Sequence, residues 1–218
     1  LAHPDPVGIV YTLYAHLADV ASNIHPGKPV LRGQALGTLG HTPAHLIPQE
    51  RAHLHFEIGL LINSRYDDWI RAGRGRNAHG AFNGRNMGGL DPLIVLRDSR
   101  RQPSFSLLAH LQSLAPAFAL VIRNPGRTPD FFVRHPALWR DPAPPGPALV
   151  LAFTESGLPL SGRNATREEA DRLGRMSAVV LTVDPAVLGR NGRRLVVKRE
   201  TGWELGRNGE VWLRLLLF

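Results

Sequence analysis

The sequence predicts a mainly β protein in which an antiparallel β-sheet domain over residues 1–98 is followed by a smaller α+β or β-rich domain over residues 99–218. Three observations predict this. Between residues 7 and 62, short apolar segments alternate with glycine and proline turns, which is typical of antiparallel strands. The polar, charged stretch 99–104 suits a linker. Beyond it, Asn191-Gly192 and Asn208-Gly209 are typical of hairpin turns.

The segment 52–58, Ala-His-Leu-His-Phe-Glu-Ile, alternates apolar residues with His53, His55 and Glu57, as a strand with one buried face does. Side chains two apart on a strand point the same way, so His53 and His55 are expected to project together and to share a metal ion or a bound water. Zinc needs three or four ligands, and this stretch offers two, with Glu57 as an outlying third. The alternative is a pair of half-buried histidines on a sheet face.

Two further motifs precede this strand. Residues 14–17 read Tyr-x-His-Leu, and residues 30–42 read Val-x-x-Gly-Gln-x-Leu-Gly-x-x-Gly-x-Thr. Together with His-Leu-His-Phe-Glu at 53–57, and in this order, they resemble the lysostaphin-type (LytM-like) zinc metallopeptidases, which cut peptide cross-links in the bacterial cell wall. The resemblance covers residues 7–62 and implies a lysostaphin-like peptidase fold.

The resemblance implies a zinc endopeptidase that hydrolyses peptide bonds in peptidoglycan, located in the bacterial cell envelope, either periplasmic or extracellular. It implies that His55 is a Zn²⁺ ligand, that His53 is a catalytic base or orienting residue, and that His16 stabilises the oxyanion or moves a proton. The chemistry agrees with these roles. Zinc lowers the pKa of bound water from about 16 to about 7, and imidazole exchanges protons in the same range.

One departure concerns the metal ligands. The family takes two further zinc ligands from an upstream His-x-x-x-Asp motif, and only His3 and Asp5 precede His16, at the wrong spacing. We expect both to be loop residues, because Pro4 and Pro6 interrupt any strand there. Either the sequence begins inside the domain, which we expect, or it is a degenerate homologue. A degenerate homologue would be a catalytically inactive peptidase-like scaffold or an activator of cell-wall hydrolases.

A second departure is the loop 43–51, which is longer than in the family and lacks glycine. Loops beside a rigid sheet commonly vary with the substrate, so this loop affects the choice of cross-link more than the chemistry. We expect His41 and His45 to be solvated loop histidines.

The composition limits the partners. The net charge of +8 comes almost entirely from arginine and would favour anionic partners, but the arginines are scattered without interleaved aromatic residues, so nucleic acid is not expected. Without cysteine, histidine and carboxylate are the strong metal ligands left. No run of about 18 apolar residues is present, so no transmembrane segment is expected. The sequence does not determine the oligomeric state.

The remaining elements are predicted from local signals. Residues 65–71 suit a short helix with Ser64 as its N-cap, and residues 73–92 suit a loop. In the second domain, Thr166-x-x-Glu169 is typical of a capping box at a helix start. Strands are predicted at 117–122, 148–154, 178–183, 194–199, 202–205 and 210–218. This domain is expected to bind cell-envelope material, such as a sugar or polymer, or to pack against the peptidase sheet.

Overall fold

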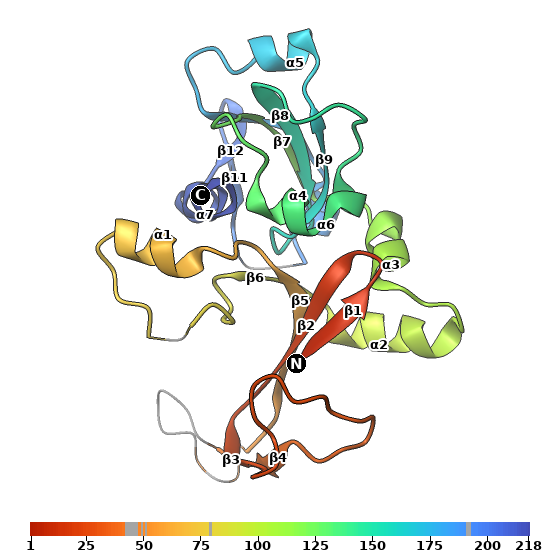
Figure 1. Cartoon of the computed structure of the whole chain (residues 1–218). Helices are drawn as coiled ribbons and strands as arrows, with labels where there is room; N and C mark the ends of the chain where they lie inside the picture. Colours follow the sequence, from red (N-terminus) through yellow and green to blue (C-terminus); the bar gives the residue numbers. More distant parts are fainter. Residues whose placement is uncertain (42–47, 49, 51, 79, 191–192) are drawn as a thin grey trace. The chain divides into compact units, whose positions relative to one another are not determined.

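The computed structural model describes residues 1–41, 48, 50, 52–78, 80–190 and 193–218, and it shows antiparallel sheets connected by helices (Figure 1). The chain forms two compact units. The first comprises Leu1 and Thr12–Glu57, and the second comprises Ala2–Tyr11 and Ile58–Phe218. The compact units therefore do not divide at residue 98, and the assignment of separate functions to 1–98 and 99–218 stays a prediction.

The first sheet confirms the expected antiparallel strands. Its order is β1-β2-β5-β6, formed by β1 (Ala2–Asp5), β2 (Gly8–Ala15), β5 (His55–Leu61) and β6 (Met87–Leu90). The prediction that Pro4 prevents a strand was wrong, because β1 lies at the sheet edge, where a proline without an N–H is tolerated. The prediction of a loop throughout 73–92 was also wrong, since Met87–Leu90 pairs with β5.

The first unit contains a two-stranded antiparallel sheet, formed by β3 (Leu17–Val20) and β4 (Gly37–Leu39). After β4 the chain passes so close to β3 that a Cβ atom on Gly40 would lie 2.4 Å from the backbone nitrogen of Ala18. Only glycine fits there, which accounts for this glycine of the 30–42 motif.

The second unit is built on a four-stranded antiparallel sheet of order β10-β7-β8-β9. Its strands are β7 (Phe118–Arg123), β8 (Ala148–Phe153), β9 (Pro159–Asn164) and β10 (Ala178–Val183), which confirms the strands predicted at 117–122, 148–154 and 178–183. Phe118, Leu120 and Ile122 of β7 face the main core, whereas Val121 packs in a smaller cluster on the other face. Alternation along β7 therefore serves two apolar layers.

Helices make the fold mixed rather than mainly β. Their bounds are α1 (Tyr66–Ala72), α2 (Pro92–Arg101), α3 (Leu107–Ser113), α4 (Asp130–Arg134), the 3-10 helix η2 (Pro136–Leu138), α5 (Arg167–Asp171), α6 (Pro185–Leu188) and α7 (Arg207–Leu217). The linker predicted from residue 99 was wrong in part, because α2 continues to Arg101. Within the part of the chain that the structure describes, no helix is long and apolar enough to cross a membrane.

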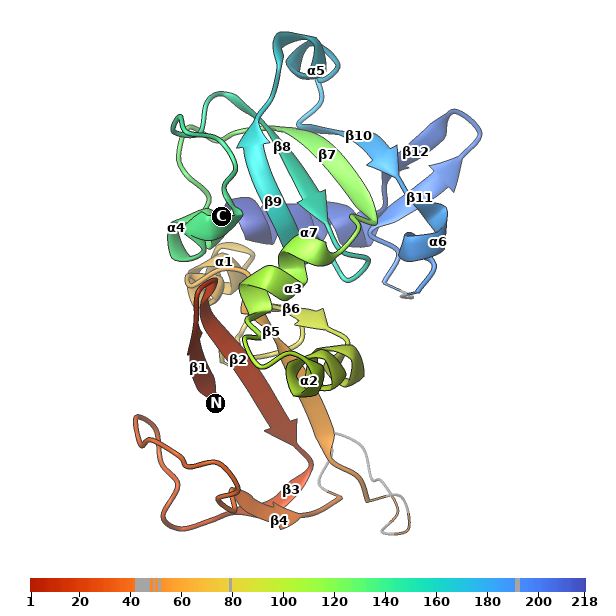
Figure 2. The ribbon, with the colours of Figure 1, turned by 90° about the vertical axis from the view of Figure 1, so that its right-hand side faces the viewer.

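The C-terminal segment corrects another prediction. The strands predicted at 194–199 and 202–205 are present as β11 (Val196–Arg199) and β12 (Gly202–Leu205), but 210–218 belongs to the helix α7. Trp212, Leu213 and Leu216 of α7 are buried in the main core, on the face that packs against the sheet of the second unit (Figure 2). A helix buries this stripe on one side, whereas a strand would divide it between two faces.

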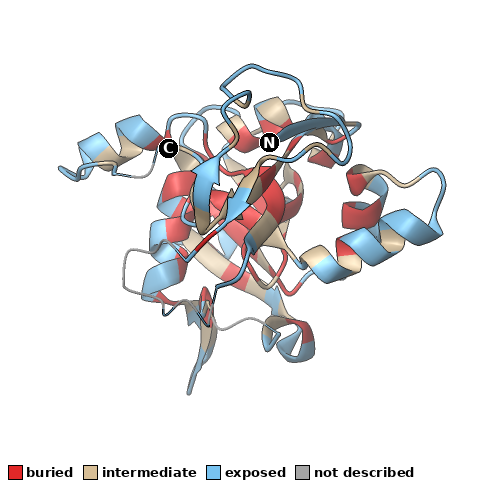
Figure 3. Ribbon diagram, turned by 90° about the horizontal axis from the view of Figure 1, so that it is seen from below, coloured by how far each residue is buried: buried red, intermediate tan, exposed pale blue. Residues whose placement is uncertain are grey.

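The caps of the helices explain where several of them begin. Thr166 and Glu169 form the predicted capping box at α5. Ser64 does not cap α1, because its hydroxyl donates instead to Asp130 at 2.7 Å. Asp5 of β1 accepts from the backbone N–H groups of Leu107 and Leu108 at the start of α3. Figure 3 colours each residue by its burial: buried residues are red, and the exposed residues, in pale blue, lie on strands as well as on helices and loops.

Candidate functional site

The candidate site lies in the first unit and is formed by His16, His53, His55 and Glu57. His16 lies between β2 and β3, and its carbonyl oxygen accepts from the Gly40 N–H at 2.9 Å. His55 is the first residue of β5, and His53 directly precedes that strand. The strand predicted from His53 therefore begins two residues later.

The imidazole ring of His16 lies close to the rings of both His53 and His55. The ring centroid of His16 lies 5.0 Å from that of His53 and 5.6 Å from that of His55, and both pairs have edge-to-face geometry. Zinc holds imidazole nitrogens at about 2.0–2.1 Å, so two rings on one ion have centroids about 5–6 Å apart. The observed separations are therefore similar to those of two imidazole rings bound to one metal ion.

A bend at His16 makes this convergence possible. The Tyr14 ring contacts the Phe56 ring, with centroids 5.1 Å apart, so these two side chains share one face of the β2–β5 strands. Strict alternation would place His16 on that same face, two residues after Tyr14. The backbone of His16 instead has φ of +64°, and its ring contacts His55, which points away from the Phe56 face. The left-handed conformation turns the imidazole toward the other two histidines.

Glu57 is the residue whose role the sequence left open. Its Oε1 atom lies 2.6 Å from Nε2 of His55, and the two side chains are 27% and 44% exposed. A carboxylate can only accept, so the Nε2–H of His55 donates this hydrogen bond. The neutral ring then has its lone pair on Nδ1. A carboxylate partner fixes the tautomer and the ring orientation of metal-binding histidines in the same way.

The donor set of this site is smaller than zinc requires. In the part of the chain that the structure describes, no group of three or more His, Cys, Asp or Glu side chains is placed to hold a metal ion. The ring separations thus suit a shared ion, but a tetrahedral site needs three or four ligands. His55, through Nδ1, is the residue here that fits a ligand role, and Glu57 fits the role of its hydrogen-bonding partner.

The structure describes several of the other histidines and acids that the sequence offers as candidates. His3 is in β1 and Asp5 caps α3, so neither is the loop residue that the sequence predicts. His41 is exposed, as expected, and His45 lies outside the described residues. His110 is buried, and its Nδ1 atom lies 3.4 Å from Oδ2 of Asp98.

Comparison with known proteins finds no match: no family model, no curated protein and no solved structure is similar to this chain. The resemblance to lysostaphin-type peptidases therefore depends on the three motifs and on the geometry that their histidines adopt.

Proposed function

We propose that this chain carries part of a zinc-dependent endopeptidase that hydrolyses peptide bonds in bacterial cell-wall peptidoglycan, as the lysostaphin-type metallopeptidases do. The observation that carries the proposal is the convergence of His16, His53 and His55 with centroids 5.0 and 5.6 Å apart. Two separate segments of the sequence supply these rings, and a strained backbone at His16 is retained to bring them together. The proposed location is the bacterial envelope, periplasmic or extracellular.

The proposal gives each residue a role that its position supports. His55 would be a zinc ligand through Nδ1, with Glu57 holding its Nε2–H and so its ring orientation. His16 lies next to His55 and to His53, and an imidazole can take a proton from water and return it to the leaving amine. When bound, zinc would supply an acidified water and a Lewis acid for the peptide carbonyl. The remaining ligands would come from outside the described residues, and the family's upstream His-x-x-x-Asp pair is their proposed source.

A second function is favoured by one observation. Among the residues that the structure describes, no three potential ligands are placed around one point for a metal. A peptidase-like scaffold or activator of cell-wall hydrolases would need the fold and no ion. The two proposals differ in their predictions for metal binding.

Metal titration and peptidoglycan cleavage distinguish them. The chain alone is expected to bind zinc weakly, with a Kd above the micromolar range, because one ligand and two neighbouring imidazoles do not complete a tetrahedral site. A longer chain that includes the His-x-x-x-Asp pair is expected to bind one zinc and to release new amines from purified peptidoglycan. His55→Ala should abolish both, and His25→Ala, at an exposed loop histidine of the same unit, should change neither. A longer chain that stays metal-free and inactive would favour the scaffold.

A further inference from the structure

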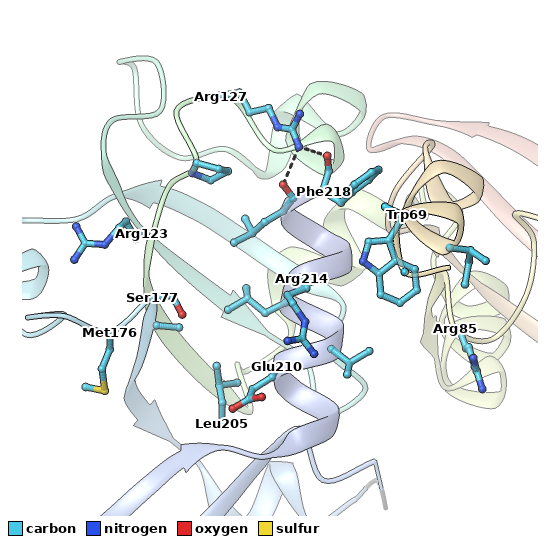
Figure 4. Close-up of a pocket in the computed structure, with 18 of the residues that line it drawn as sticks. Trp69, Arg85, Arg123, Arg127, Met176, Ser177, Leu205, Glu210, Arg214 and Phe218 are labelled. Carbon is cyan, nitrogen blue, oxygen red and sulfur yellow. Dashed lines mark hydrogen bonds between the residues drawn. The ribbon is translucent and has the colours of Figure 1, made fainter. Parts of the chain in front are cut away.

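The second unit contains an open groove with a volume of about 1190 Å³, walled by α1, α7, the end of β7 and the turn before β10 (Figure 4). Every residue that lines it belongs to the second unit, so its geometry does not involve the histidine site. Pockets for small molecules have volumes of about 300–1000 Å³. The groove is larger than these, so it has room for a ligand longer than a typical small molecule.

One wall is a face of α7 that the core covers only in part, since Leu213 and Leu217 line the groove and also pack in or against the core. Glu210, Val211, Arg214 and Leu217 line the groove at helical spacing, while Trp212 and Leu216 are buried in the core. Val211 is 39% exposed, and Met176 on the opposite wall is 55% exposed. The groove thus offers accessible apolar side chains, including a methionine, whose flexible thioether adapts to varied partners.

The charged groups of the groove are mainly arginines. Four line it, Arg85, Arg123, Arg127 and Arg214, against two glutamates and no lysine, histidine or aspartate. Glu204 already pairs with Arg199, which donates to it at 2.7 Å. The surface that remains is positive and apolar together.

The four arginines differ in whether their side chains already form hydrogen bonds within the protein. Arg127 donates to the carbonyl oxygens of Leu217 and Phe218, and Arg123 donates to the carbonyl of Gly174 at 2.9 Å. Within the described residues, the side chains of Arg85 and Arg214 form no hydrogen bond or ion pair. These two guanidinium groups are therefore available for an external anion, and a guanidinium binds a carboxylate through two parallel hydrogen bonds.

The arrangement of the arginines indicates the kind of anion. Figure 4 shows four arginines at separate positions around the groove: Arg85, Arg123, Arg127 and Arg214. A single phosphate would require them to converge on one point, which they do not do. We propose that this groove binds an acidic peptide segment that carries both carboxylates and apolar side chains. Its carboxylates pair with Arg85 and Arg214, and its apolar side chains pack on Val211 and Met176. Zinc and peptidase activity play no part in this binding.

A labelled peptide of alternating glutamate and leucine tests the proposal by fluorescence anisotropy on the full chain. Binding is expected, with an affinity that falls as salt is added, since the charges are exposed. The isosteric glutamine–leucine peptide should bind about tenfold more weakly, because it loses one or more charge-assisted hydrogen bonds. Arg214→Gln should weaken binding of the glutamate–leucine peptide about tenfold, and Met176→Gln about threefold.

Matched controls make the outcome specific. Arg100→Gln, at an exposed arginine of α2 outside the groove, should leave the Kd unchanged. The double variant Arg85→Glu, Arg214→Glu should lose the glutamate–leucine peptide and gain a lysine–leucine peptide, a gain that misfolding would not produce. The proposal is overturned if Arg100→Gln weakens binding as much as Arg214→Gln, or if the glutamine–leucine peptide binds equally well. Binding to phosphatidylglycerol vesicles without binding to the peptide would also overturn it.

Discussion

Nε2 of His55 lies 2.6 Å from Oε1 of Glu57, two residues along the same strand. Because the residues are two apart on β5, both side chains project from one face, and the carboxylate meets the ring without any bend in the backbone. The hydrogen bond fixes Nε2 as the protonated nitrogen. It therefore decides which nitrogen of His55 is available to a metal or a substrate.

Glu57→Ala is expected to weaken the preference of the His55 ring for the Nε2–H tautomer. An exposed pair of this kind contributes about 0.2–1 kcal/mol, so the preference for the Nε2–H form should fall by up to about fivefold. Nitrogen-15 chemical shifts of the His55 ring measure the tautomer ratio directly, without metal or substrate. Glu57→Gln, which keeps an acceptor oxygen, should retain most of the preference. A ratio unchanged in Glu57→Ala would show that the carboxylate does not set the tautomer.

His135 of the second unit gives a prediction about pH. Its ring is 1% exposed; Nδ1–H donates to the Val7 carbonyl at 2.9 Å, and Nε2 lies 3.3 Å from Nη1 of Arg134, which donates to it. Burial, above all, lowers the pKa of His135 from 6.5 to about 4; nearby Arg134 lowers it further, while the Val7 hydrogen bond and Asp130 oppose the change. The folded chain therefore keeps this ring neutral where the unfolded chain takes up a proton.

The contribution of His135 to the free energy of unfolding should consequently be complete above pH 6.5 and should decrease as the pH drops toward 4. The total loss is about 3 kcal/mol, with no further contribution below the folded pKa. Urea unfolding at pH 7 and pH 4.5 measures it. His135→Gln keeps a donor for Val7 but does not titrate, so the difference between wild type and variant should shrink at the lower pH. A pH dependence identical in both proteins would assign the loss to other groups.

The sequence predicted the elements that depend on local pattern. Alternation located β5 with His55 and Glu57, and the capping box located the start of α5. It failed where tertiary packing decides. The apolar run at 215–217 suits a strand or a helix equally, and Asn208-Gly209 suggested a hairpin, but the core accepts Trp212 and Leu216 from one helical face.

The candidate site shows the same limit. The motifs identified which histidines meet, yet period-two reasoning alone would have kept His16 on the face of Tyr14. No residue type in the Tyr-x-His-Leu segment signals a left-handed backbone at a non-glycine position. The bend follows from the Gly40 N–H donating to the His16 carbonyl and from the pairing of β3 with β4, which are contacts across about twenty residues of sequence.

Glu169 at α5 gives a prediction about a cap. Arg163 donates to both of its carboxylate oxygens, at 2.8 and 2.6 Å, and this hydrogen-bonded pair lowers the pKa of Glu169 to about 2. Glu169→Gln keeps an acceptor oxygen for the capping box but loses the ion pair with Arg163, so it should lower the free energy of unfolding at pH 7 by about 0.2–1 kcal/mol, the range for a partly exposed pair. The stabilisation is present above the usual pKa of glutamate and is lost as the pH falls through 2. Glu168→Gln, one residue earlier and with no ion pair to any residue that the structure describes, is the control and should change stability little.

The strained backbone of His16 predicts which of two variants, His16→Gly or His16→Ala, is the more stable. A left-handed conformation costs a residue with a Cβ about 1–2 kcal/mol, whereas glycine adopts it freely. His16→Gly and His16→Ala both remove the imidazole, so their difference isolates the backbone. The glycine variant should be the more stable by about 1 kcal/mol, measured as slower hydrogen exchange at the Gly40 amide, which donates to the His16 carbonyl. At Ala18 of β3, which has an ordinary backbone, glycine should instead speed exchange by weakening the strand. If glycine weakened the Gly40 hydrogen bond at both positions, the bend at His16 would carry no strain, and the chain would not be sustaining an unfavourable conformation to gather its imidazoles.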